Sequence, residues 1–222
     1  MAILPEITLE EALVRRDAVV ADPALAERVS AIIRRIRDGG ADAFRAVASE
    51  IGDPEPCWVD RAGLERLASE TSDEVHALLD RTVARVRAVA EAQVPRPIDP
   101  IDQAGTRTSV RLVPERAAAC YAPAGRHPLP SSAIMGLVPA RVAGVETAFM
   151  VTPALSPLMA AAAVSAGADG ALVAGGAQAV AACALGVNPA PRAEIVVGPG
   201  NAYVAEAKRQ LVGTIGIEGV AG

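Results

Sequence analysis

The stretch AAACYAPAGRHPLPSSAIMGLVPARVAGVETAFMVT, residues 117–152, sets the fold class. An apolar run at 117–122 is typical of a buried strand, a loop with Pro and Gly leads into an apolar helix at about 131–143, and a second strand follows at 146–152. The alternation continues with strands expected at 170–174, 193–197 and 214–218, and helices at about 156–166, 177–185 and 201–211. Such alternation predicts right-handed βαβ units and a mostly parallel sheet. We expect an α/β fold in which residues 115–222 form a Rossmann-like domain, with helices on both sheet faces.

Residues 1–114 have the pattern of amphipathic helices instead. Thr8 and Glu11 have capping-box spacing, which predicts a short helix through about residue 18. Asp22 and Pro23 are a second start signal, and apolar residues then recur at helical spacing until Gly39 and Gly40 end the helix. A third helix is expected at about 41–49.

A second capping box, Thr71 with Glu74, predicts the start of the longest helix, whose apolar stripe runs from Val75 to Val89 and needs a covering partner. Residues 95–105, PRPIDPIDQAG, have the composition of a connector, and TRTSVRLV at 106–113 alternates as a half-exposed strand does. We place the domain boundary between 114 and 115, with 1–114 mainly helical.

Composition excludes several classes of protein. The net charge of −5 argues against nucleic-acid binding, which needs a basic face. We expect no membrane span and no signal peptide, and therefore a cytoplasmic protein. Cys57, Cys120 and Cys183 are widely spaced, so we expect small buried side chains and neither disulfides nor a zinc knuckle. The two histidines, His76 and His127, are too few for a site that needs several imidazoles.

Three loops follow predicted parallel strands, at 121–132 (YAPAGRHPLPSS), 174–178 (AGGAQ) and 198–201 (GPGN). Ligands of open parallel sheets bind beyond the carboxyl ends of the strands, where glycine lets them approach the backbone and helix N-termini favour phosphate. Each loop alone also fits an ordinary turn. The GxGxxG dinucleotide fingerprint with its following acidic residue does not occur.

These loops also carry a resemblance. GPGNAYVAEAKRQ at 198–210 closely resembles the signature of the histidinol dehydrogenase family. In order along the chain, YAPAGRHPLPSSAIM, VPARVAGV and AGGAQAVAACALG agree with it too, and a weaker helical likeness extends back to about residue 25. Members of this family oxidise an amino alcohol, L-histidinol, through an aldehyde to L-histidine with NAD. The resemblance therefore implies an NAD-dependent oxidoreductase of histidine biosynthesis, with a small-molecule substrate and a homodimeric state.

Carried over by position, the family's NAD contacts fall on Tyr121, Gln178 and Asn201. A phenol can flank a ring, and amides can pair with ribose or nicotinamide groups. Other roles stay open at this stage. Tyr121 could cap the sheet edge, Gln178 could cap its own helix, and Asn201 could be an N-cap.

The sequence departs from the family's pattern in two places. Ala124 stands where the family has glycine, and Arg126 and His127 replace small residues in the same loop. The family's zinc ligands and its Glu-His acid–base pair belong to a further half that follows a Pro-Ser-Glu segment absent here, so we expect no catalytic or metal site in this chain. Two alternatives stay open: a short non-catalytic relative that binds a nucleotide or a protein partner, and a family member acting on another small alcohol.

Overall fold

The computed structural model describes residues 8, 22–96, 98–103, 106–124 and 128–219. Its centre is a six-stranded sheet of order β1-β6-β5-β4-β7-β8. The parallel strands are β4 (Ala117–Tyr121), β5 (Thr147–Thr152), β6 (Gly170–Val173), β7 (Ile195–Val197) and β8 (Gly216–Ile217). The predicted α/β fold with a mostly parallel sheet is confirmed, and each strand lies within its expected run.

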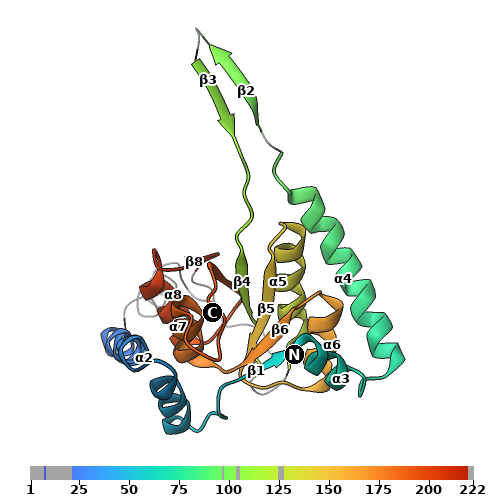
Figure 1. Cartoon of the computed structure of the whole chain (residues 1–222). Helices are drawn as coiled ribbons and strands as arrows, with labels where there is room; N and C mark the ends of the chain where they lie inside the picture. The colour runs from blue at the N-terminus through green and yellow to red at the C-terminus, as the bar shows by residue number, and fades with distance from the viewer. Residues whose placement is uncertain (1–7, 9–21, 97, 104–105, 125–127, 220–222) are drawn as a thin grey trace.

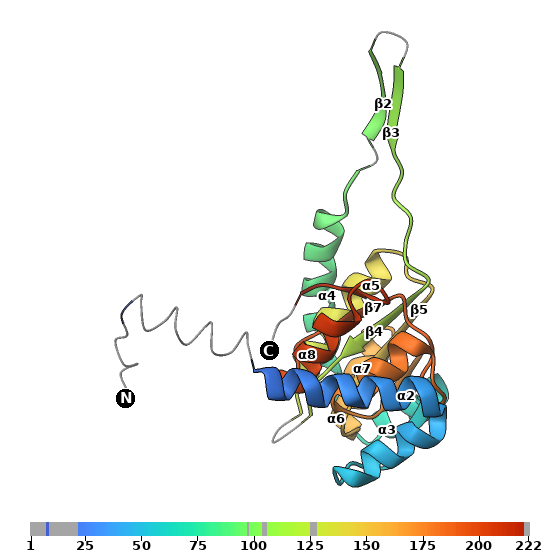
Figure 2. The same cartoon turned by 90° about the vertical axis from the view of Figure 1, so that its left-hand side faces the viewer.

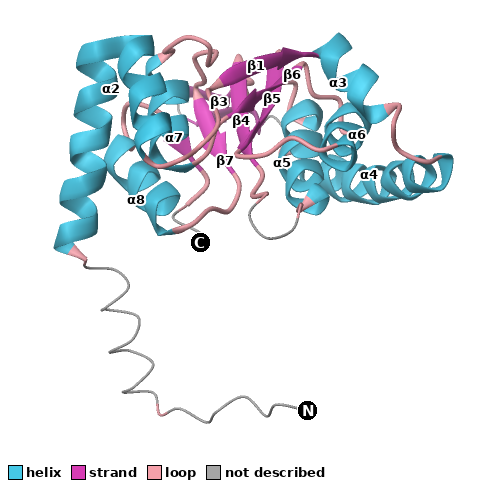
Figure 3. Cartoon of the chain, turned by 90° about the horizontal axis from the view of Figure 1, so that it is seen from below, coloured by secondary structure: helices cyan, strands magenta, loops and turns pink. Residues whose placement is uncertain are grey.

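Helices cover both faces of this sheet (Figure 3). One face packs against α2 (Pro23–Glu50), α7 (Gly176–Leu185) and α8 (Ala202–Leu211), and the other against α3 (Arg61–Ala68), α4 (Asp73–Gln93), α5 (Pro130–Val142) and α6 (Pro157–Ser165). Successive side chains of a strand point to opposite faces. Ala119 and Tyr121 of β4 accordingly join the first core, while Ala118 and Cys120 join the second.

The two central helices α6 and α7 are almost wholly apolar, with Gln178 an exception in α7, because both lie between the sheet and other helices. Every residue of α7 from Ala177 to Ala184 is buried. Alanine keeps these helices close to the strands, since the chain has only one Trp, two Tyr and two Phe with which to fill a wider gap. The close spacing between layers fixes the positions of the loops at the strand ends.

The helix α2 begins at the expected place, with Asp22 as N-cap accepting from the backbone N–H groups of Ala24 and Leu25. Its path breaks at Gly40, whose φ of 58° is not helical, so the predicted stop and restart there are confirmed. The predicted helix from Thr8 through residue 18 lies outside the described residues, except for Thr8 itself.

The start of α4 differs from the prediction. Ser72, not Thr71, is the N-cap, and it makes no side-chain capping bond. The capping box is wrong because α3 ends just before it, and the Thr71 N–H already bonds the Ala68 carbonyl. The apolar stripe finds its cover in α5 and α6, against which Leu79 and Val83 are buried.

Three elements of the N-terminal part, β1, α3 and β2, were not predicted. The strand β1 (Cys57–Asp60) pairs antiparallel with β6, so residues before 114 complete the same sheet as those after it, and α3 packs against α6. The boundary at 114/115 stays a prediction. Two of the three cysteines, Cys120 and Cys183, are buried as expected, but Cys57 is exposed because it lies on this edge strand.

The expected connector at 95–105 is in part a strand. β2 (Ile98–Gln103) and β3 (Thr106–Val110) pair as an antiparallel hairpin that extends far from the body of the molecule (Figures 1 and 2). The pairing has a register shift between Ile98 and Ile101, the interval that contains Pro100, which has no N–H to donate to the ladder. The predicted strand at 106–113 is confirmed for its first five residues.

Candidate functional site

The loops after β4, β6 and β7 lie at one edge of the sheet because these strands are parallel. They meet around Tyr121, the last residue of β4. Its hydroxyl oxygen accepts a hydrogen bond of 3.1 Å from the N–H of Gly176, at the start of α7. Tyr121 is 4% exposed, and burial raises the pKa of its phenol, so the hydroxyl stays neutral.

Gly198 contacts Tyr121 from the other side. Its φ is 105°, which L-residues with side chains rarely adopt, and a Cβ built on it would overlap the carbonyl oxygen of Tyr121. Glycine is therefore required at this position for both conformation and space. The GPGN turn and the start of β4's loop are thereby in direct contact.

Gln178 lies in the first turn of α7 and is 2% exposed. Its side-chain Nε2 donates to Oδ2 of Asp53, 3.0 Å away, which lies just after α2. Partial burial raises the pKa of Asp53, although the bond from Gln178 opposes this shift. The side-chain amide of Gln178 thus ties the AGGAQ loop to the N-terminal part of the chain, and does not cap its own helix.

Asn201 is the N-cap of α8. Its Oδ1 accepts from the N–H groups of Tyr203 and Val204, at 3.0 and 3.1 Å. The residue is exposed, and its Nδ2 group is a donor that the cap does not use. Of the three residues predicted from the sequence, Tyr121 and Gln178 flank Gly176, and Asn201 lies on the loop that contacts Tyr121 through Gly198.

We call the edge of the sheet where the loops after β4, β6 and β7 lie the rim. The helices that begin at the rim differ in the capping of their first turns. α8 is capped by Asn201, whereas the N-cap residues of α5 and α7 make no side-chain capping bond, and in α7 the N–H of Gly176 is already bonded to the Tyr121 hydroxyl. First-turn N–H groups without a cap are ready to bind an anion, and the helix dipole favours negative charge there. Gly175, the N-cap of α7, is buried, and a Cβ on it would meet the side chain of Pro153.

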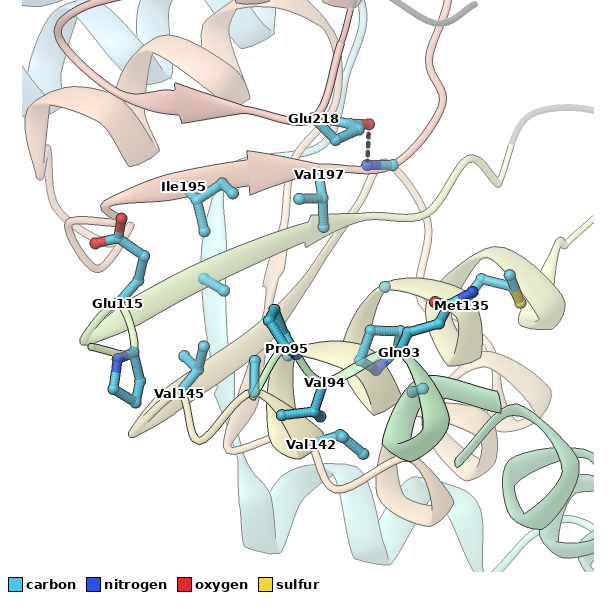
Figure 4. Close-up of a pocket in the computed structure, with 18 of the residues that line it drawn as sticks. Gln93, Val94, Pro95, Glu115, Met135, Val142, Val145, Ile195, Val197 and Glu218 are labelled. Carbon is cyan, nitrogen blue, oxygen red and sulfur yellow. Dashed lines mark hydrogen bonds between the residues drawn. The ribbon is translucent and has the colours of Figure 1, made fainter. Parts of the chain in front are cut away.

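An apolar cavity of about 1030 Å³ opens beside the rim, between β4, β7, α5 and the end of α4 (Figure 4). Ser131 and Ser132 of the first loop and Gly198 and Pro199 of the third contribute to its wall. Most of the remaining wall is aliphatic. Figure 4 shows Glu218 at its upper side, bonded to the backbone of Gly198.

Within the part of the chain that the structure describes, no group of three or more His, Cys, Asp or Glu side chains is placed to hold a metal ion. Of the two histidines, His76 lies within 3.0 Å of the Ala68 carbonyl, away from the rim. His127 and Arg126 lie outside the described residues, while Ala124 precedes them in the same loop. No described helix has both the length and the apolar character needed to cross a membrane.

Comparison with known proteins identifies the family. The model of the histidinol dehydrogenase family matches residues 15–222. The chain belongs to the histidinol dehydrogenase family. The resemblance first noted in the loops therefore holds for nearly the whole sequence.

Several histidinol dehydrogenases are similar along this length. That of Halobacterium salinarum is 39% identical over 215 residues, which cover 95% of this chain and 50% of the relative. The histidinol dehydrogenase of Nitrosomonas europaea is 36% identical over 213 residues, which cover 92% of this chain and 49% of the relative. The chain thus spans about half the length of these relatives.

The fold agrees as well. The crystal structure of histidinol dehydrogenase from Elizabethkingia anophelis superposes with a TM-score of 0.81 at 23% identity, over 91% of this chain and 48% of that one. Both comparisons place the likeness over about half of a histidinol dehydrogenase.

Three polar residues near the rim were not singled out from the sequence: Asp53, Lys208 and Glu218. Lys208 did leave a signal, because it stands at a core position of α8 in the spacing Val204, Ala207, Lys208, Leu211. Asp53 and Glu218 left none, because their partners lie on other elements of the fold.

Proposed function

We propose that this chain forms the NAD-binding part of a histidinol dehydrogenase, the enzyme that oxidises L-histidinol through the aldehyde to L-histidine. The observation that carries the proposal is the meeting of three glycine-bearing loops around Tyr121 at the carboxyl edge of a parallel sheet. Membership of the family makes this cluster a candidate for the cofactor, since such edges are where open α/β sheets bind nucleotides.

The residues at the rim fit a dinucleotide. The first turns of α5 and α7, apart from the Gly176 N–H that Tyr121 accepts, offer backbone N–H groups to phosphate oxygens. Asn201 supplies an exposed amide donor. Tyr121 and Gln178 hold the AGGAQ loop in place by their bonds to Gly176 and Asp53. NAD, when bound, accepts the hydride of the substrate.

Zinc does not fit the described part of this chain, where no cluster of ligands occurs. Following the family resemblance, we assign the zinc ligands and the acid–base pair of the reaction to no described residue, and derive no catalytic step from this chain. We further propose that the complete protein is a cytoplasmic homodimer that acts on an amino alcohol.

The test is calorimetric titration of the chain with NAD, with and without zinc. We expect saturable binding of one NAD per chain that does not depend on zinc. The proposal is contradicted if the chain is folded by circular dichroism and yet shows no detectable NAD binding. Zinc-dependent reduction of NAD with histidinol would show that this chain does hold a catalytic metal.

A pair of variants at Asn201 separates the cofactor contact from the cap. Asn201→Ser keeps an oxygen that caps α8 but loses the amide donor, so we expect weaker NAD binding with the melting temperature nearly unchanged. Asn201→Ala removes both functions, and we expect it also to destabilise the fold by about 0.5–2 kcal/mol. Equal NAD affinity in wild type and Asn201→Ser would exclude a contact through the amide.

A further inference from the structure

Lys208 is the one charged side chain in the buried set among the described residues. It is fully buried, on the face of α8 that carries Val204 and Leu211. A buried ammonium group is costly unless it is paired and hydrogen-bonded, and an aliphatic side chain would suit this core position. Hydrophobic packing does not explain why a lysine occupies this position.

The partners of Lys208 explain its presence. Its Nζ donates to the carbonyl oxygen of Gly198 and to Oε1 of Glu218, the latter at 2.9 Å. The same Oε1 accepts from the N–H of Gly198 at 2.6 Å. Both backbone polar groups of Gly198 are therefore held by one ion pair (Figure 4 shows the bond from Gly198 to Glu218).

This pair acts where sheet pairing stops. β7 ends at Val197 and β8 at Ile217, so Gly198 and Glu218 each lie one residue beyond a strand. Because Gly198 lies beyond the strand, no ladder hydrogen bond fixes its position. Its backbone, with φ 105°, packs against the Tyr121 carbonyl on one side and is hydrogen-bonded to the ion pair on the other side. Without the pair, the GPGN turn would be fixed from one side only.

We propose that Lys208 and Glu218 are positioning residues that hold the GPGN turn in the conformation that receives the cofactor. They act through Gly198 and need not touch the cofactor themselves. The inference rests on the proposed function, because it assigns a role within the same NAD site. Its structural part, the restraint of Gly198, can be measured separately.

Lys208→Met is the decisive variant, because it keeps the length of the side chain and removes the charge. Arg209→Met is the matched control: Arg209 lies on the same helix and pairs with Glu206, without contacting the turn. Two readouts are needed, the affinity for NAD and the exchange of single amide hydrogens, both at a temperature where all variants are folded. The amides of Ala168 and Asp169, which donate to the carbonyls of Ala163 and Ala148 at the opposite edge of the sheet, are the internal reference.

In Lys208→Met we expect the Gly198 amide to exchange at least about tenfold faster while the two reference amides keep their rates, because only the turn is released. NAD binding should weaken about tenfold, as expected for the loss of a hydrogen bond to a charged group. Arg209→Met should match the wild type in both readouts. Glu218→Gln should show the same changes at a smaller size, and serves as the second variant where Lys208→Met does not fold.

The inference is overturned if Lys208→Met binds NAD as the wild type does, or if all three amides accelerate together, which would indicate general destabilisation. The proposed function is untouched by either result as long as the wild type binds NAD. If the wild type does not bind NAD, the proposed function fails, and with it the cofactor role of the pair. The Gly198 exchange rate then decides only whether the pair restrains the turn.

Discussion

Gly198 and Gly213 show how one residue type meets two different constraints. Both have positive φ, 105° and 89°, but a Cβ on Gly198 would overlap the Tyr121 carbonyl, whereas nothing lies within 4 Å of a Cβ on Gly213. Alanine at Gly213 therefore meets backbone strain alone, while alanine at Gly198 also forces two strand ends apart. Comparing the two alanine variants therefore isolates the cost of the overlap with the Tyr121 carbonyl.

We expect Gly213→Ala to lower the free energy of unfolding by about 1 kcal/mol, from backbone strain. Gly198→Ala should cost about 1–3 kcal/mol more, as overpacking in a fixed site does. Urea unfolding of both variants against the wild type measures the difference. Similar values for the two would mean that the Tyr121 carbonyl can move aside at little cost.

The three cysteines differ in reactivity. Cys57 is exposed on β1, whereas burial raises the pKa of both Cys120 and Cys183 to about 12. The thiolate is the reactive form, so at pH 8 the two buried thiols are both protonated and inaccessible. We expect a thiol reagent to titrate one cysteine per native chain and three in denaturant. Cys57→Ser should abolish the native reaction, and a rapid reaction that persists in this variant would show that a core thiol is reachable.

At the scale of elements, β1 is joined to the sheet by its tryptophan. Trp58 lies edge-to-face with Phe149, at 5.5 Å between ring centroids, and a Cβ on Gly170 of β6 would overlap the Trp58 ring. Gly170 thus makes the recess in which the ring lies. Sequence periodicity gave no sign of this, because β1 has only four residues.

Gly170→Val should displace the Trp58 ring toward water. As Trp58 is the single tryptophan, its emission reports this strand alone, and we expect a shift to longer wavelength with a loss of stability of about 1–3 kcal/mol. Cys57→Ser on the same strand, at an exposed position, should leave the spectrum unchanged. An unchanged emission in Gly170→Val would mean that β1 adjusts without releasing the ring.

At the scale of the whole molecule, the N-terminal part contributes to both layers around the sheet. α2 packs on α7 and α8, α4 packs on α5 and α6, and β1 extends the sheet beyond β6. Removing residues 1–114 would uncover α7 and α8 on one side and α5 and α6 on the other, whose buried side chains include Val180 of α7 and Leu137 of α5. The division at 114/115 stays a prediction, and the contacts of α2, α4 and β1 with residues after 115 give it a direct test.

We expect a fragment of residues 115–222 to lack a cooperative unfolding transition and to bind a hydrophobic dye, because its helices lose their outer cover. The 222-residue chain should unfold in one transition that coincides by far-UV circular dichroism and tryptophan emission. A fragment with its own sharp transition would instead support two separate domains.

The sequence by itself determined the βαβ alternation, because strand and helix periods and the glycines between them are local properties. It also determined the loops of the candidate site, since parallel strands bring their carboxyl ends to one edge whatever else the chain does. Family membership was readable in those loops too. The N-cap role of Asn201 was open from the sequence, and only the coordinates decided it.

Only the tertiary structure decided which residues hold the loops together. The pairing of β1 with β6, the Gln178–Asp53 bond and the Lys208–Glu218–Gly198 contact each join residues whose partners cannot be found by local spacing. The strand β2 and its pairing with the predicted strand β3 were missed for a related reason, because Pro and Asp are typical of a connector until a partner strand satisfies the backbone. Local pattern fixes where elements and turns occur, whereas contacts between distant segments depend on packing, which the linear order of residues does not reveal.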